Sequence, residues 1–252
     1  MYDDTFAGVY DRLMEDTDYH AWAEHYAALF RQAGLPSDPR LVRALDAACG
    51  TGNMTLALHA LGYRMTGADR SVEMLAVASE KSRSRGIAIP FIRQDMRSLA
   101  VHRPMDAVVC ACDGVNYMLT DDDARRFFTA ARRALKPGGG LFFDISSAYK
   151  LERTLGGRCI GEDRGDIVFL WRNEYNPLKR VIAMDLTFFT REPDDRYRAS
   201  RETHIQRAHD ADRIIALLKD CGFKNARAFG EMSLYPPEPS CERIHFAAVR
   251  ED

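Results

Sequence analysis

The sequence predicts an α/β fold in which a doubly wound parallel sheet is interrupted by an antiparallel β insert. Up to residue 150, short apolar segments alternate with amphipathic segments of helical length, as in strand–helix–strand units. A glycine loop at 49–53 follows the first apolar segment. Beyond residue 150 the hydrophobic period changes to 2, which is typical of strands. A chain of 252 residues has room for one large domain with an insertion.

The elements of the first 150 residues follow from periodicity and capping signals. The segments with strand character are 43–49, 63–69, 89–95, 105–113 and 140–146. The predicted helices are 19–34, 54–62, 71–86 and 120–140. Gly34 is a natural helix stop, and Ser71 and Thr120 are N-cap residues. Such an alternation places ligands at the carboxyl edge of the strands.

The second half predicts the insert and the end of the main domain. Period-2 stretches at 166–176, 179–192 and 195–209 are separated by turn formers and predict three antiparallel strands. On the middle one, Ile182, Met184, Leu186 and Phe188 share a face. A helix over 210–222 and strands over 224–232 and 243–251 then close the α/β domain. We expect that domain to comprise 1–150 and 206–252, with the insert at 151–205.

Composition and charge narrow the class of protein. Charged residues are 29% of the chain and no apolar run reaches about 20 residues, so we expect a protein without a membrane span. The N-terminus lacks a signal-peptide core, which predicts a cytoplasmic protein. A net charge of −2 weighs against a dedicated nucleic-acid binder, although a local basic patch is compatible with it.

The cysteines and histidines show no spacing of metal ligands. The six cysteines include no C-x-x-C pair, so we expect reduced thiols and no metal site. Cys110 and Cys112 should point to the same side of a strand. The remaining histidines apart from His204 are interpreted as ordinary: His20, His25, His59, His102, His209 and His245.

The glycine loop reads "LDAACGTGN" over 45–53. Gly50 and Gly52 fit the first two glycines of a dinucleotide-binding fingerprint, but Thr55 stands at the third place. No Gly-Lys-Ser/Thr follows, so a Walker loop is excluded. The loop therefore indicates close approach to a ligand smaller than a dinucleotide. On this stretch alone, a tight strand–helix turn without a ligand is the alternative.

Acidic residues end the next two predicted strands. Asp69 lies 23 positions after Asp46, where a carboxylate accepts hydrogen bonds from both hydroxyls of a ribose. A plain helix-N-terminal aspartate is the alternative. Asp95 ends the third strand, where its carboxylate could accept a hydrogen bond from an adenine amino group. The thioether of Met96 could pack on the adenine ring. Three acids at successive strand ends beside a glycine loop are together stronger evidence for a nucleotide-like ligand than each acid is alone.

These motifs resemble a known family. "LDAACGTGN", "GADRS", "RQDM", "DAVVCACDGVNYM" and "LKPGGGLFFD" resemble, in order and spacing, the motifs of class I S-adenosylmethionine-dependent methyltransferases over residues 40–150. The resemblance implies a seven-stranded Rossmann-like sheet whose last strand is antiparallel. The N-terminal segment and the insert are similar to small-molecule N-methyltransferases, namely amino-sugar and glycine N-methyltransferase-like enzymes and a bacterial YqeM-like group.

The resemblance also implies roles for single residues, with S-adenosyl-L-methionine as cofactor and S-adenosyl-L-homocysteine as product. Asp46 would face the ammonium of the cofactor, Asp69 the ribose, and Asp95 and Met96 the adenine. Arg70, which replaces an apolar residue often found there, would flank the adenine with Met74. The backbone beside the methionine part would come from Ala48, Cys49, Gly50, Gly52 and Asn53. Cys112 would lie beside the sulfonium, and Tyr10 and Tyr19 would belong to an N-terminal helical lid.

Residues of the acceptor site follow from the insert and from the end of the fourth strand. Glu202, His204 and Gln206 alternate on one strand face, which either forms a polar ceiling over the acceptor or faces solvent. His204 would be the base if the acceptor is an ammonium. Tyr117 competes for that catalytic role. The predicted acceptor-binding residues are Asp113, Asn116, Tyr117 and Arg207. We expect Trp171 and Phe188 to belong to the core of the insert rather than to form a platform for the substrate.

The predicted activity is methyl transfer to a nitrogen or oxygen of a small polar molecule by a monomer or homodimer. A nucleic-acid methyltransferase is the alternative, but the place of its D/N-P-P-Y/F motif reads "CDGVNY", and "YPPEP" at 235–239 comes too late. A nicotinamide oxidoreductase is disfavoured by Thr55. A protein that binds the cofactor without chemistry stays open, as does an insert acting as lid, dimer contact or both.

Overall fold

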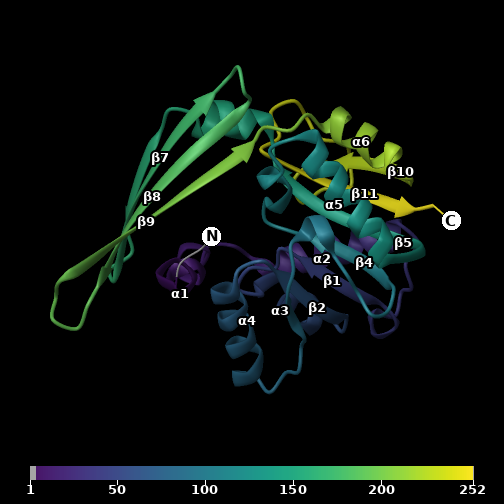
Figure 1. The fold of residues 1–252 in the computed structure, drawn as a ribbon, viewed down its shortest axis with the longest axis horizontal. Helices are drawn as coiled ribbons and strands as arrows, with labels where there is room; N and C mark the ends of the chain where they lie inside the picture. Colours follow the sequence, from purple (N-terminus) through teal and green to yellow (C-terminus); the bar gives the residue numbers. More distant parts are fainter. Residues whose placement is uncertain (1–3, 252) are drawn as a thin grey trace.

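Two separate sheets organise the computed structural model, which describes residues 4–251 (Figure 1). The larger sheet has seven strands in the order β10-β11-β5-β4-β1-β2-β3. The smaller sheet has four strands in the order β6-β7-β8-β9 and extends away from the larger one on one side (Figure 1). The predicted α/β fold with a doubly wound sheet and an antiparallel insert is confirmed.

The elements of the main domain surround the larger sheet. Its strands are β1 (Arg43–Ala47), β2 (Arg64–Asp69), β3 (Phe91–Arg93), β4 (Met105–Cys110), β5 (Leu135–Ser146), β10 (Phe223–Phe229) and β11 (Arg243–Arg250). The α-helices are α1 (Asp4–Leu13), α2 (Tyr19–Gln32), α3 (Asn53–Ala60), α4 (Val72–Ser84), α5 (Asp121–Ala134) and α6 (Ala211–Asp220). Short helical turns are η1 (Pro39–Leu41), η2 (Met96–Ser98), η3 (Gly114–Tyr117) and η4 (Lys150–Leu155).

The strand order fixes where a ligand binds. β1 lies between β2 and β4 and is parallel to both, so the chain reverses its direction of winding at β1. Ligands of such sheets collect at the carboxyl ends of the strands near this point. β11 is antiparallel to β5 and to β10, as the resemblance implied. The glycine loop therefore stands at the switch point.

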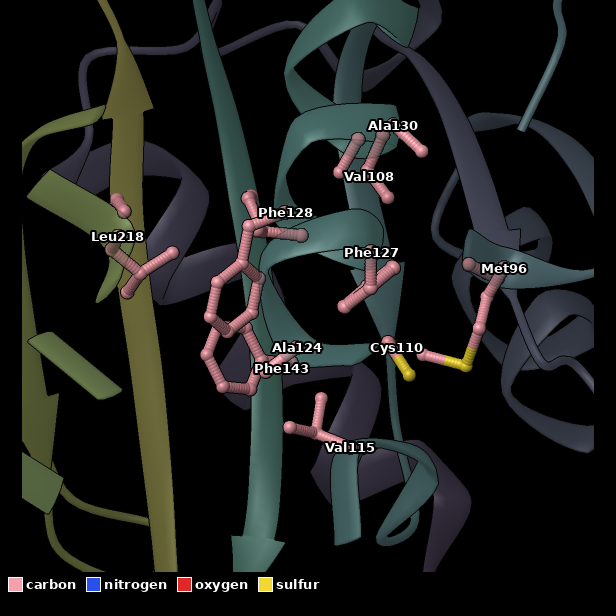
Figure 2. Close-up of a cluster of buried hydrophobic side chains, with 14 of the residues drawn as sticks. Met96, Val108, Cys110, Val115, Ala124, Phe127, Phe128, Ala130, Phe143 and Leu218 are labelled. Atoms are coloured by element: carbon pink, nitrogen blue, oxygen red, sulfur yellow. The ribbon is translucent and has the colours of Figure 1, made fainter. Parts of the chain in front are cut away.

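Apolar layers fill both sides of the sheet. Figure 2 shows part of one layer, in which Phe127 and Phe128 of α5 meet Phe143 of β5 and Cys110 of β4. The opposite layer joins side chains of α2 and α3 to the other face of the same strands. Phe142 belongs to that second layer although it neighbours Phe143, because successive strand side chains alternate between faces.

Two sequence-based details of the main domain need correction. The helix predicted over 120–140 ends at Ala134, and β5 already begins at Leu135. Pro137 lacks an amide hydrogen and its ring clashes with a preceding helical turn, which ends the helix before it. Cys110 and Cys112 do not point the same way: Cys110 packs in one layer and Cys112 against the other, since Cys112 has left the strand with φ 57°.

The insert has four strands rather than three. β7 (Ile167–Asn176), β8 (Val181–Arg191) and β9 (Tyr197–Arg207) match the prediction, and β6 (Cys159–Asp163) pairs with β7 as an additional edge strand. The sequence of β6, "CIGED", is mostly exposed and carries no apolar alternation. Strand pairing alone, and not a buried face, defines it. In the described part of the chain, no helix is long and apolar enough to cross a membrane.

Candidate active site

A cavity of 390 Å³ opens where the glycine loop, the carboxyl ends of β2 and β4, helix α1 and the insert meet. Its size falls in the range of roughly 300–1,000 Å³ typical of small-molecule sites. Side chains of β7, β8 and β9, among them Trp171, Met184 and His204, line one wall. A smaller cavity of 220 Å³ shares Arg70, Tyr117 and His204 with it.

Two buried carboxylates lie under the glycine loop. Asp69 accepts hydrogen bonds from the backbone N–H of Gly50 at 2.9 Å and of Ser71 at 2.8 Å, one on each oxygen. Asp46 accepts the hydroxyl of Thr55 at 2.5 Å. Burial raises the pKa of Asp46 to about 7, because the charged form loses its hydration. A cation beside Asp46 would reverse that penalty.

The carboxylate at the third strand end has a different environment. Asp95 caps η2 and holds the guanidinium of Arg97 through both of its oxygens, with Nη2 at 2.7 Å. Arg97 also donates to Asp123 at 2.9 Å. The hydrogen bonds from Arg97 hold the pKa of Asp95 below its usual range. Asp95 therefore stays ionised at the cavity wall, with Met96 packed behind it.

Tyr117 of η3 and His204 of β9 bring the main domain and the insert into contact. The Tyr117 hydroxyl lies 3.1 Å from Nδ1 of His204 although 87 residues separate them. Burial lowers the pKa of His204 to about 4, so the imidazole is neutral at physiological pH. His204 and Gln206 are buried and line the cavity, which rules out the solvent-facing alternative for this face of β9.

The end of β4 adopts an uncommon backbone conformation. Cys112 and Asp113 are consecutive non-glycine residues in the left-handed region, with φ 57° and 65°. The fully buried Asp144 accepts both of their N–H groups, at 2.8 and 3.2 Å, and the hydroxyl of Tyr26 at 3.0 Å. Arg243 of β11 is paired with both Asp113 and Asp144. This buried cluster holds Asp113 at the cavity wall against a conformation that costs roughly 1–3 kcal/mol per residue.

The comparisons with known proteins identify the family. A methyltransferase-domain family model matches residues 44–139. YqeM of Bacillus subtilis (strain 168), whose name describes a methyltransferase, is 34% identical over 248 residues, which cover 97% of this chain and 96% of YqeM. The crystal structure of an S-adenosylmethionine-dependent methyltransferase from Clostridium acetobutylicum ATCC 824 is 31% identical, covers 99% of each chain and superposes with a TM-score of 0.86.

The chain belongs to the S-adenosylmethionine-dependent methyltransferases. A further relative of this methyltransferase is the dTDP-4-amino-2,3,4,6-tetradeoxy-D-glucose N,N-dimethyltransferase of Saccharopolyspora spinosa, which is 31% identical over 141 residues. That alignment covers 55% of this chain and 53% of the relative.

The residues of this methyltransferase fit its cofactor. Asp46 is a buried carboxylate whose raised pKa calls for a neighbouring cation, such as the ammonium of a methionine group. Asp69 is buried, yet each of its oxygens keeps a lone pair beside the backbone bond it accepts. Among the described residues no cluster of His, Cys, Asp and Glu is arranged to hold a metal ion.

The cavity of the methyltransferase brings most of the sequence-predicted residues together. The cofactor set at its wall is Tyr10, Tyr19, Asp46, Ala48, Cys49, Gly50, Asn53, Asp69, Arg70, Met74, Asp95, Met96 and Cys112. Of the acceptor and catalytic set, Asp113, Tyr117 and His204 also line it. Trp171 contributes to the wall. Phe188 is fully buried, as expected of a core residue, but in a cluster that joins the insert to helices α1 and α4.

Three predicted residues lie outside the cavity wall. Gly52 has φ 78° at the start of α3, and a Cβ there would lie 3.0 Å from Ala78, so it serves the turn and its packing. The Asn116 amide is bonded to backbone groups of Ser146 and Arg207, which leaves it buried and structural. The Arg207 side chain pairs with Asp121 at 2.8 Å on the outside of the methyltransferase.

The sequence interpretation missed several residues at the site. Arg243 and Lys150 line the cavity, but each stands in a segment without a recognisable motif. Asp144 had a visible signal, because "LFFD" ends in an acid like the earlier strands. Asp11 carries only the signal of an acid inside an amphipathic helix.

Proposed function

We propose that this methyltransferase methylates a nitrogen or oxygen of a small polar molecule, and that an amine nitrogen is the acceptor that suits its site best. The observation that carries the proposal is the Tyr117–His204 pair, in which Tyr117 of η3 in the main domain and His204 of β9 in the insert both line the cavity. The insert forms the roof of that acceptor site. Residues from the main domain and the insert therefore enclose the acceptor together.

On this assignment the parts of the cofactor determine the roles of the other cavity residues. Asp69 holds the ribose hydroxyls, Asp95 and Met96 contact the adenine, and Asp46 faces the ammonium. The bound sulfonium supplies an electrophilic methyl group, so the protein need only align the acceptor and exclude water. Asp113, fixed by Arg243, offers a carboxylate to the polar part of the acceptor.

The pKa of His204 favours an amine over an alcohol. A general base works best when its pKa lies near the operating pH, and a histidine with a pKa of about 4 is too weak a base for an alcohol. A neutral amine already presents its lone pair and needs only a hydrogen-bond acceptor for its N–H. In the tautomer whose Nδ1–H donates to the Tyr117 hydroxyl oxygen, Nε2 of His204 is that acceptor nitrogen, and the bond to Tyr117 fixes the orientation of the ring.

Independent support comes from the cavity walls and from the relatives. The insert wall carries apolar Phe169, Trp171 and Leu186, which suit a compact molecule. The Saccharopolyspora spinosa relative is named for an amino-sugar acceptor, and the same chemical class suits this cavity. A nucleic-acid acceptor would instead require a basic channel and salt-sensitive binding.

The decisive experiment is transfer of a labelled methyl group from S-adenosylmethionine into a metabolite extract, followed by mass spectrometry. We expect a labelled small amine whose added mass lies on nitrogen. Parallel reactions contain total RNA and DNA from the same cells. Labelled nucleic acid with an unlabelled metabolite pool would overturn the proposal in favour of the nucleic-acid alternative.

With that acceptor in hand, His204→Ala should lower kcat by about tenfold, because it removes a hydrogen bond that orients the amine and such a bond contributes about 0.5–1.5 kcal/mol. The affinity for S-adenosylhomocysteine should stay unchanged. Since the pKa of His204 is about 4, it stays deprotonated above pH 5, and any rise of kcat/KM between pH 6 and 9 reports the acceptor amine. His20→Ala, an exposed residue on α2, is the matched control. An unaltered kcat in His204→Ala would remove His204 from the mechanism.

A further inference from the structure

We infer that Asp11 of α1 is a positioning residue that fastens the N-terminal helix to the cofactor loop and so controls cofactor release. Its carboxylate accepts hydrogen bonds from the Thr51 hydroxyl at 2.6 Å and from the Asn53 amide at 2.9 Å. Lys81 of α4 donates to Asp11 at 2.7 Å and also to the amide oxygen of Asn53. Four side chains from α1, the glycine loop and α4 thus form one network.

The network is continuous with the residues that contact the cofactor. Thr51 and Asn53 flank Gly52, whose left-handed conformation starts α3. Gly50, which precedes Thr51, donates its N–H to Asp69. An unbroken series of hydrogen bonds and covalent neighbours therefore runs from Asp11 to the carboxylate proposed to hold the ribose. Displacement of Asp11 removes its hydrogen bonds to Thr51 and Asn53, and these bonds constrain the same loop that Asp69 holds through Gly50.

Helix α1 is also a wall of the cavity. Phe6, Tyr10 and Leu13 line it, and the helix lies between α4 and β9 (Figure 1). On the insert side, the Phe6 ring packs against Phe188 at 5.6 Å and His204 at 5.4 Å. Asp11 holds the other side of the helix. Helix α1 therefore bridges the glycine loop and the insert wall of the cavity. On this inference, the cofactor leaves only after α1 moves away from the glycine loop.

Partial burial strengthens the ion pair between Asp11 and Lys81, because less water screens the two charges. The side chains of Lys81 and Asp11 are 19% and 36% exposed, so the ion pair is only partly screened by water. Although burial opposes ionisation, the hydrogen bonds from Lys81 and Thr51 keep the pKa of Asp11 below its usual value. The carboxylate is therefore charged at neutral pH, and charge-assisted hydrogen bonds are about twice as strong as neutral ones.

The test measures dissociation of S-adenosylhomocysteine from the full chain by stopped-flow displacement, which needs no knowledge of the acceptor. Asp11→Asn should raise the dissociation rate about tenfold, because loss of a charged hydrogen-bond partner weakens the closed state by that order. Lys81→Met should act in the same direction, and the double variant should add little to the larger single effect, since both remove one contact. Glu80→Gln, an exposed neighbour on α4, should leave the rate unchanged.

Two further readouts separate positioning from plain stability. Hydrogen exchange of residues 4–13 in the complex should accelerate in Asp11→Asn and not in Glu80→Gln. Asp11→Glu should restore part of the slow release, because it keeps the charge. A dissociation rate in Asp11→Asn equal to that of the unmodified protein overturns the inference. So does a lower melting temperature of the ligand-free variant with an unaltered rate, since that outcome makes Asp11 structural only.

Discussion

Asp69→Ala should weaken S-adenosylhomocysteine binding about 100-fold or more. On the proposed assignment, the substitution removes two charged hydrogen bonds to the ribose. Each is of the order of 1.5–3 kcal/mol, and 1.4 kcal/mol corresponds to a factor of ten. It also releases the Gly50 and Ser71 N–H groups that Asp69 holds at the loop. Calorimetric titration of the purified protein measures the affinity directly.

Two variants make the Asp69 result specific. Asp69→Asn keeps the size and one acceptor oxygen, so its affinity should fall between those of Asp69→Ala and the unmodified protein. Asp122→Ala removes an exposed carboxylate of α5 that does not line the cavity, so this variant should bind S-adenosylhomocysteine normally. Normal affinity in Asp69→Ala would show that the ribose lies elsewhere.

Arg243→Met should lower the free energy of unfolding by about 3–5 kcal/mol at pH 7.5. The substitution leaves the fully buried Asp144 and the partly buried Asp113 without their cation, which is the costly way to break a buried ion pair. Urea unfolding, followed by circular dichroism, measures the loss. Arg125→Met, which breaks the half-exposed pair with Asp220, should change the stability by less than about 1 kcal/mol.

The pH dependence of that loss has a definite sign. With Arg243 in place, burial already raises the pKa of Asp144, and, despite burial, the guanidinium holds the pKa of Asp113 below its usual value. Loss of Arg243 raises both pKa values, so protonation stabilises the folded variant more than the unmodified protein. The deficit of Arg243→Met relative to the unmodified protein should therefore shrink between pH 7.5 and pH 5. A deficit that stays constant or grows over this range would show that lost packing over Trp22, which Arg243 covers at 4.8 Å, outweighs the charges.

The sheet could be predicted because its causes are local. Alternating apolar strands and capped helices depend on neighbours in sequence, and Ser71 and Thr120 cap their helices as their residue types indicate. The edge strand β6 could not be predicted in this way, because its pairing to β7 is non-local and its side chains carry no periodic signal.

The sequence by itself determined one side of the cavity, since Gly50, Asp69 and Asp95 stand at strand ends that a parallel sheet must bring to one edge. Only the tertiary structure decided which residues lie opposite them and how helix α1 is held. Tyr117 and His204 meet across 87 residues, Arg243 reaches Asp113 and Asp144 from the last strand, and Asp11 reaches the loop from the first helix. These contacts depend on how separate elements pack, and packing leaves no period or spacing in the sequence for such single side chains.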